Sequence, residues 1–219
     1  MAVRVEKRYS HGLNLLTNFT YSKLMDRRRF LNDSDPMPEK RVSSDDRPLR
    51  VVVSGSYDLP FGKGKRFDAH NGIVNRVIGG MVINAIYNYQ VGAPMNWEGQ
   101  NPLFLGGDLQ ADPRNIDRAF DTTRFNTNSA QQLGNNIRTF SSRFGNLRVD
   151  GVNNWDLSIL KNTSITERVS LQLRLEMFNA MNHPIFDGPQ LSPTNAAFGK
   201  ITNQPNLARN IQLGARLVF

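Results

Sequence analysis

Cysteine is absent from the 219 residues of the chain, which excludes both a disulfide framework and a thiolate metal site. Long apolar runs are absent too, since no window of about 18 apolar residues could form a transmembrane helix. The first residues, MAVRVEKRYS, lack the apolar segment of a signal peptide, so we expect none here. These absences alone would indicate a soluble protein, but the arrangement of the apolar residues predicts a different setting.

Acidic residues are outnumbered, because 27 Lys and Arg against 19 Asp and Glu give a net charge of +8. Such an excess can indicate binding to nucleic acid. The only dense basic run is DRRRF at residues 26–30, and most other arginines stand singly. We therefore expect no nucleic-acid partner, and a basic nucleic-acid binder is kept only as a remote third hypothesis.

Residues that could carry catalytic chemistry are few and scattered. The histidines fall in one turn and two links, each without a second ligand at metal-binding spacing: His11, His70 and His183. The acidic stretch NDSDPMPE at 32–39 lacks the glycine of a calcium loop, and FGKGK at 61–65 lacks the spacing of a phosphate-binding loop. We therefore predict no enzyme, no catalytic residue, no metal and no cofactor.

Apolar and polar residues alternate along much of the chain, with the two-residue period of β-strands. The alternation predicts seven strands, at residues 2–10, 13–23, 47–60, 75–92, 152–162, 168–182 and 211–219. A tight turn at Ser10–Gly12 joins the first two strands. Tyr9 is expected on the same face as Val3 and Val5. The strands are longer than the five or six residues usual in globular sheets, and they suit tilted membrane-spanning strands of about 9–11 residues.

The links between these strands alternate in length. Long links are expected at about residues 24–46, 92–151 and 183–207. The other links are the turn at Ser10–Gly12, TSITE at 163–167 and a medium segment that includes FGKGK. Outer-membrane barrels have long outer loops and short periplasmic turns, so this rhythm predicts such a barrel with a periplasmic C-terminus.

Aromatic residues give a second indication, because membrane barrels carry aromatic girdles at both interfaces. Four fall at the predicted outer ends of strands on the apolar face: Tyr21, Tyr87, Tyr89 and Trp155. Tyr57 and Phe219 fall at inner ends on that face. Phe178 is the exception, since it shares the parity of Gln172 and Arg174 on the polar face.

The last eight residues resemble the C-terminal β-signal that the barrel assembly machinery recognises. Its positions are Gln212, Gly214, Leu217 and Phe219. A terminal strand with an unpaired edge can be captured by strand addition, and Gly214 would allow close backbone approach. The alternative is an ordinary last strand that happens to end in Phe.

Several phrases resemble the C-terminal barrel segments of TonB-dependent receptors. They include KRYSHGLNLLTNFTYSKLMD, RVVVSGSYDLPFGKGK, IGGMVINAIYNYQVGAPM, NNWDLSILKNTSITERVSLQLRLEMFNAMNHPIFDGP and AFGKITNQPNLARNIQLGARLVF. The resemblance is to the large Oar-like kind, with a carboxypeptidase-regulatory-like N-terminal domain, that is abundant in Acidobacteria. It implies a transporter barrel of about 22 strands with a plug, driven by the TonB system. We therefore expect residues 1–219 to be one C-terminal barrel segment, with the plug and the N-terminal strands outside it.

The fold class predicted is thus all-β: an antiparallel up-and-down meander of about seven long strands, forming a partial, open outer-membrane β-barrel with long outer loops. Seven strands are fewer than the smallest single-chain barrel needs, so the sheet should have two unpaired edges and aggregate if alone. The alternative is a standalone soluble β-sheet binding module.

The predicted location is the outer membrane of a Gram-negative cell. The partners implied are outer-membrane lipid, the barrel assembly machinery, the TonB system through the missing plug, and an unidentified ligand. Loops as long as 92–151 are usually functional or disordered. Candidate ligand contacts in it are Trp97, Phe104 and Arg114, and the alternative is a mobile loop.

Overall fold

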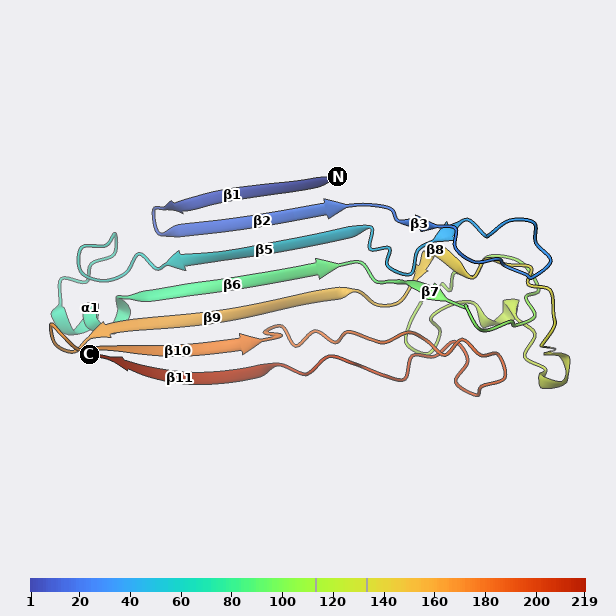
Figure 1. Cartoon of the computed structure of the whole chain (residues 1–219). Coiled ribbons are helices and arrows are strands. Elements are labelled where there is room, and N and C mark those ends of the chain that lie inside the picture. The colour runs from blue at the N-terminus through green and yellow to red at the C-terminus, as the bar shows by residue number, and fades with distance from the viewer. Residues whose placement is uncertain (113, 133) are drawn as a thin grey trace.

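A computed structural model describes residues 1–112, 114–132 and 134–219. Its main feature is a seven-stranded sheet in the order β1-β2-β5-β6-β9-β10-β11 (Figure 1). The strands are β1 (Ala2–Ser10), β2 (Leu13–Tyr21), β5 (Leu49–Asp58), β6 (Met81–Gln90), β9 (Val152–Ser164), β10 (Ser170–Phe178) and β11 (Asn210–Val218). All neighbouring strands are antiparallel, and β1 and β11 form the two edges of a sheet that does not close. The predicted open meander is confirmed.

Smaller elements lie in the links. The pairs are β3 (Met25–Asp26) with β4 (Arg41–Val42), and β7 (Pro94–Asn96) with β8 (Arg143–Arg148). The helices are α1 (Gly72–Ile78) and the short 3₁₀ turns η1 (Thr122–Arg124) and η2 (Ser129–Gln131). Within the described residues, none of these helices is long and apolar enough to cross a membrane.

The prediction of one continuous strand at 75–92 is wrong over its first part. Asn71 caps a helical turn there, because its side chain accepts hydrogen bonds from the backbone N–H groups of Ile73 and Val74. The helix α1 ends at Gly79, and Gly80 follows with a φ of 67° before β6 starts at Met81. The apolar residues of 73–78 follow the three- and four-residue spacing of a helix, so the two-residue alternation of a strand does not extend into this segment.

The two faces of the sheet differ most clearly in chemistry at mid-strand. The strand register aligns side chains into rows that cross the sheet. One row contains Leu15, Gly55, Ala85, Leu157, Met177 and Ile211. The adjacent row, on the opposite face, contains Asn14, Ser56, Asn84, Ser158, Glu176 and Gln212. The first row therefore consists of side chains without hydrogen-bonding groups. The next row, one residue further along each strand and on the opposite face, consists of side chains that can all form hydrogen bonds.

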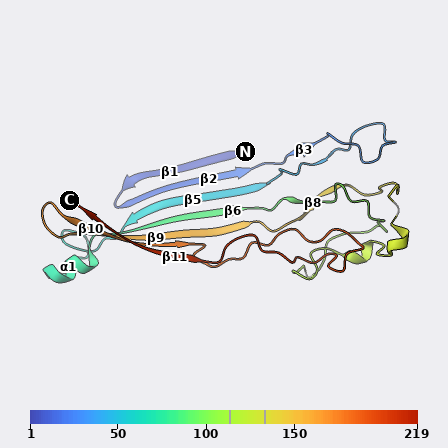
Figure 2. The same cartoon turned by 60° about the horizontal axis from the view of Figure 1, so that its bottom comes forward.

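No second layer covers the apolar face among the described residues, and the sheet is a single twisted layer (Figure 2). On β11, for example, Leu213 is 84% exposed and Leu217 is 54% exposed. Two of the aromatic residues predicted at outer strand ends on this face are in contact, since the ring centroids of Tyr87 and Trp155 lie 4.5 Å apart in a stacked arrangement. A sheet of this kind would be unfavourable in water because it exposes a large contiguous apolar surface.

One residue of β1 departs from the predicted alternation. A register shift between Lys7 and Ser10 inserts an extra residue into the strand. The Tyr9 hydroxyl consequently donates to Oδ2 of Asp58, at 2.5 Å, on the polar face. The expectation that Tyr9 shares a face with Val3 and Val5 is therefore wrong.

The links sort between the two ends of the sheet as predicted (Figure 1). Three long links, residues 22–48, 91–151 and 179–209, gather at one end, and we call them the loop layer. The β1–β2 turn, the β9–β10 turn, α1 and the C-terminus lie at the other end. The β1–β2 turn is tight because His11 and Gly12 both have positive φ, 54° and 80°.

The hydrophobic core lies in the loop layer and not in the sheet. Its buried members all come from the 91–151 link: Met95, Trp97, Leu109, Ala119, Phe120, Phe125, Phe140 and Leu147. Leu191, Phe198 and Ile201 pack against them from the third long link. Ring centroids of four phenylalanines lie 5.5–6.2 Å from Trp97. The long link is therefore a packed structure, unlike an ordinary surface loop.

Candidate functional site

A cavity of about 590 Å³ lies where the polar face of the sheet meets the loop layer. Its wall consists of the polar-face side chains at the loop-layer ends of β5, β6, β9, β10 and β11: Arg50, Asn88, Gln90, Val152, Asn154, Asp156, Phe178 and Asn210. The β10–β11 link adds Asn179, Ile185, Asn206 and Leu207. These side chains lie close together because the loop-layer ends of five adjacent strands lie side by side in the sheet.

The lining is rich in groups that both donate and accept hydrogen bonds. Carboxamides predominate, with one guanidinium from Arg50 and one carboxylate from Asp156. Oδ1 of Asp156 accepts from Nδ2 of Asn154 and from the backbone N–H of Asn179, each at 3.0 Å. The ring of Phe178 is 45% exposed beside them. A few positioned polar groups around apolar surface are typical of small-molecule sites.

Asn179 holds the β10–β11 link over this cavity. Its backbone has a φ of 48°, a left-handed conformation that asparagine tolerates better than most residues. Its side-chain oxygen accepts from the His183 N–H at 2.8 Å, and its Nδ2 donates to the His183 and Leu207 carbonyls at 3.2 and 3.1 Å. The side chain thus ties the start of the link to residues near its end. The cavity keeps its shape through these bonds.

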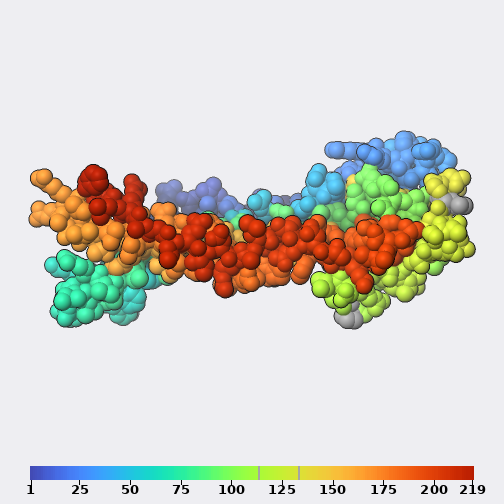
Figure 3. Space-filling view, turned by 90° about the horizontal axis from the view of Figure 1, so that it is seen from below, coloured from blue at the N-terminus to red at the C-terminus, as the bar shows by residue number. Residues whose placement is uncertain are grey.

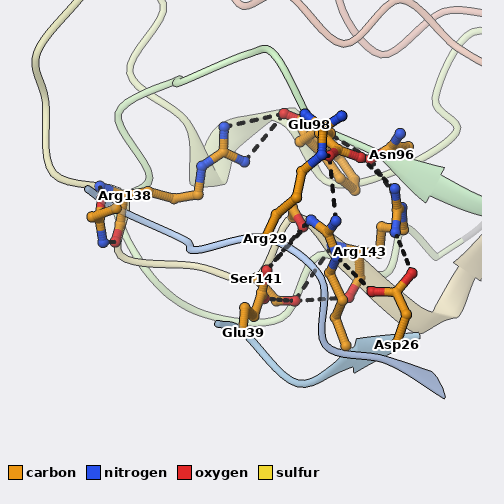
Figure 4. Close-up of polar contacts among 12 residues, drawn as sticks. Asp26, Arg29, Glu39, Asn96, Glu98, Arg138, Ser141 and Arg143 are labelled. Carbon is orange, nitrogen blue, oxygen red and sulfur yellow. Dashed lines mark hydrogen bonds and ion pairs between the residues drawn. The ribbon is translucent and has the colours of Figure 1, made fainter. Parts of the chain in front are cut away.

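A ring of four charged side chains lies deeper in the loop layer, and we call it the charge ring (Figure 4). Its members are Asp26, Arg41, Glu98 and Arg143. Arg41 lies 3.1 Å from Asp26 and 3.3 Å from Glu98, measured between nitrogen and oxygen. Arg143 lies 3.3 Å from Asp26 and also pairs with Glu98. Each arginine thus bridges the same two carboxylates, and β3 and β4 are fastened to the 91–151 link.

Neighbouring polar groups complete the charge ring. Arg143 Nε donates to Oδ1 of Asn96 at 3.1 Å, and Arg41 donates to Oγ of Ser142 at 2.5 Å. Burial acts to raise the pKa of Glu98, but the positive charges of Arg41 and Arg143 outweigh it and leave the pKa below its ordinary value. Because both arginines are about 5% exposed and fully partnered, this cluster is a structural joint and not an open binding site.

The three candidate ligand contacts lie in different environments in the structure. Trp97 is completely buried in the loop-layer core and has no exposed surface to offer. Phe104 packs against the same core, with ring centroids 5.4 Å from Phe125 and 5.1 Å from Phe140. Arg114 is exposed and donates to the Arg148 carbonyl at 2.7 Å. None of the three lines the cavity, and ligand contact by the partly buried Phe104 and by Arg114 stays a prediction.

The four residues of the predicted β-signal lie on or just beyond β11. Gln212 pairs with Glu176, Gly214 with Arg174 and Leu217 with Leu171, while the other edge of β11 is free within the described sheet. Phe219 is 93% exposed. A Cβ on Gly214 would lie 3.8 Å from the nearest atom, which is ordinary contact, so close approach to β10 does not require glycine there. Recognition of these residues by the assembly machinery stays a prediction.

Sequence reasoning missed both the cavity and the charge ring. Phe178 was the available signal for the cavity, because an aromatic residue on the polar face broke an otherwise regular pattern. No sequence signal pointed to the charge ring, since Asp26 and Arg143 are separated by 117 positions and only the fold brings them together.

A family model described as an outer membrane beta barrel domain matches residues 1–212. The chain belongs to this family. No curated protein and no solved structure matches the chain. Membership places the chain in the outer membrane, which confirms the predicted location.

In an outer-membrane barrel the apolar face of the sheet contacts lipid and the polar face lines the lumen. The loop layer is then the outer end of the barrel, because outer loops are long and periplasmic turns short. The cavity accordingly lies inside the lumen, near its outer mouth. A soluble binding module is disfavoured, since it would expose the apolar face to water.

Proposed function

We propose that this chain is the C-terminal wall of a TonB-dependent receptor, and that its cavity contacts the ligand before uptake. The observation that carries the proposal is the cavity itself: a site on the lumenal wall in which polar groups are positioned around apolar surface, at the outer mouth and beneath an ordered loop layer. The phrase from Asn153 to Pro184, which resembles these receptors most specifically, supplies the β9 and β10 walls and Asn179.

The loop layer supports a receptor over a simple diffusion pore. Residues 91–151 form a buried aromatic core, and the charge ring fixes them to β3 and β4. Ordered outer segments present a ligand with a pre-formed surface, which lowers the entropic cost of binding. Partners in this proposal are the TonB system through a plug, the barrel assembly machinery through β11, and outer-membrane lipid. Nucleic acid, cofactors and enzymatic chemistry have no part in it.

The ligand class that suits the cavity is a neutral solute rich in hydroxyl groups, such as an oligosaccharide. Carboxamides on Asn88, Gln90 and Asn154 can donate to and accept from hydroxyls. Phe178 offers a ring face on which the apolar side of a sugar ring can stack. The opposite charges of Arg50 and Asp156 give the lining no strong preference for an ionic ligand.

The receptor proposal is tested on the full-length protein that contains this chain. Purified in detergent, it should bind the periplasmic domain of TonB in surface plasmon resonance, and deletion of its TonB-contacting N-terminal segment should abolish that binding. In planar bilayers it should show no stable open channel, because a plug blocks the lumen. Steady open-pore conductance together with no TonB binding would overturn the proposal.

The cavity is tested separately by thermal shift with a panel of neutral and anionic oligosaccharides. At least one neutral oligosaccharide should raise Tm, and Asn154→Leu and Phe178→Ala should each remove the shift. Gln172→Leu, on the same lumenal face but nearer the periplasmic end, is the matched control and should retain it. A shift by anionic compounds alone would contradict the ligand class while leaving TonB binding untouched.

A further inference from the structure

The helix α1 turns its apolar side outward, the reverse of a helix in a soluble protein. Ile73, Val74 and Val77 lie along one side of its two turns, and their exposed fractions are 79%, 41% and 64%. None of the seven residues of α1 is buried. These three side chains therefore do not hold the helix on the rest of the described chain; of its apolar residues only Ile78, at the C-terminal end, is half-buried.

Polar contacts hold α1 in place. Asn75, on the side of the helix opposite its apolar stripe, donates to Oδ1 of Asp68 at 2.6 Å and accepts from the Ala69 N–H at 3.0 Å. Asp68 also accepts from the backbone N–H groups of His70 and Gly64, at 2.8 and 3.1 Å. These hydrogen bonds, led by that from Asn75, lower the pKa of Asp68 to about 2. The polar side of α1 is thus fixed to the preceding link, which leaves the apolar side facing away.

Lys161 shows on which side of the barrel wall α1 lies. Its position in β9 has the parity of Leu157 and Ile159, and it pairs with Met81 and Leu173 on the lipid-facing side. Its Nζ donates to the Arg76 carbonyl at 2.8 Å and also to the Gly79 carbonyl. The C-terminal end of α1 therefore sits over the lipid-facing side at the periplasmic end, and Figure 3 shows this segment (turquoise) projecting from the sheet.

Basic and aromatic residues flank the apolar stripe. Residues 61–80 contain four Lys and Arg against one acidic residue, Asp68: Lys63, Lys65, Arg66 and Arg76. Phe61 and Phe67 are 36% and 51% exposed, with ring centroids 5.5 Å apart. The guanidinium of Arg66 lies 5.6 Å from the centre of the Phe67 ring. Exposed aliphatic, aromatic and basic side chains in one short segment match the composition of helices that lie in a membrane interface.

We infer that α1 is an interfacial anchor that lies in the periplasmic leaflet of the outer membrane, beside the barrel. Ile73, Val74 and Val77 insert at the boundary between headgroups and acyl chains. The neighbouring lysines and arginines contact the phosphates of anionic phospholipids. This inference rests on the outer-membrane placement of the barrel and does not depend on the ligand or on TonB.

The test uses the full-length protein in proteoliposomes of phosphatidylethanolamine and phosphatidylglycerol. The chain contains no cysteine, so Val77→Cys and Ile73→Cys introduce single labelling sites in this segment for the environment-sensitive dye NBD. Each label should show blue-shifted emission, quenching by brominated lipid and loss of iodide quenching. Leu213→Cys is the reference for lipid contact, and Glu167→Cys, in the exposed β9–β10 turn at the same end of the sheet, is the aqueous reference. Heat-modifiable migration on gels confirms that each labelled variant is folded.

Two outcomes overturn the inference. Iodide quenching at Val77 and Ile73 equal to that at Glu167 would show that the apolar side faces water. Protection from both iodide and brominated lipid would show that a protein covers it. The contribution of charge is tested with the variant Lys63→Gln/Lys65→Gln/Arg66→Gln. In the parent, the labels at positions 73 and 77 should insert more deeply into vesicles that contain phosphatidylglycerol than into vesicles of phosphatidylcholine alone. The variant should lose this difference. Equal insertion of the parent in both lipids would refute that contribution.

Discussion

Single residues decide the shape of the lumenal cavity, and Asn179 is the clearest case. It is 8% exposed, adopts a left-handed backbone conformation, and makes hydrogen bonds that span the β10–β11 link. The alternation along β10 indicated a strand that continues to about residue 182. The strand instead stops at Phe178, because Asn179 leaves the extended conformation and Asn182 is also left-handed, with a φ of 51°. Alternation carries no information about such local backbone changes.

Replacing Asn179 with alanine should free the β10–β11 link. The expected cost is about 2–3 kcal/mol, since the substitution removes three hydrogen bonds made by a buried side chain and leaves alanine in a left-handed conformation. Limited proteolysis of the full-length protein should then cut within residues 179–209 while the barrel strands stay intact.

Asn203→Ala is the matched control for Asn179→Ala. Asn203 lies in the same link and donates one exposed hydrogen bond to Asp187, so its removal should cost less than about 1 kcal/mol. Equal protease resistance of the parent and the Asn179 variant would show that the link is held by other contacts.

At the scale of elements, the seven strands could be predicted and the structure of the loop layer could not. In strands such as β9 and β10, apolar and polar residues alternate because one side contacts lipid and the other water. The polarity of each residue therefore indicates which side of the sheet it faces. The β3–β4 and β7–β8 pairs are too short for a periodic signal, and their stability comes from the charge ring and from Trp97. Contacts over about a hundred residues cannot be read from local pattern.

Opposite faces of β9 give a paired prediction. Leu157→Arg places a charge on the lipid-facing side and should destabilise the barrel by about 2–4 kcal/mol. Ser158→Arg, one residue along the strand, points into the lumen beside Glu176 and should be tolerated. Urea unfolding of the reconstituted full-length protein, followed by heat-modifiable migration, measures both. Equal losses in the two variants would contradict the assignment of the faces.

Acid should loosen the loop layer. The pKa of Glu98 in the folded protein lies below its ordinary value of 4.5, so the carboxylate stabilises the fold above that pH. This stabilisation is lost as the pH falls below 4.5 and through the lowered pKa. The chain has two tryptophans, so Trp155→Phe leaves Trp97 as the only reporter within this chain. Quenching of Trp97 by acrylamide should be constant from pH 7 to 5 and rise below about pH 4.

The Glu98→Gln variant is the control for this titration. It keeps the shape of the side chain but removes the charge between Arg41 and Arg143. Breaking a buried ion pair costs about 3–5 kcal/mol, so Trp97 should already be more accessible to acrylamide at pH 7. An unchanged parent signal down to pH 2 would mean that the charge ring does not control the loop layer.

At the scale of the whole molecule, the sheet ends at two edges, β1 and β11, whose outward backbone groups are unpaired within the described residues. Free edges with an uncovered apolar face favour association with other strands. Expressed without further strands, residues 1–219 should form oligomers or aggregates in detergent, seen by light scattering. A monomer that unfolds cooperatively would contradict this expectation.

The position of the hydrophobic core also determines what the cell surface presents. The buried aromatic cluster of residues 91–151 lies outside the membrane, so an antibody or phage meets a folded epitope assembled from three separate links. Antisera raised against short peptides from that segment should recognise denatured protein better than intact cells. Substitutions at exposed positions between the core residues can then alter recognition by an antibody or phage without affecting the barrel wall or its lumenal site.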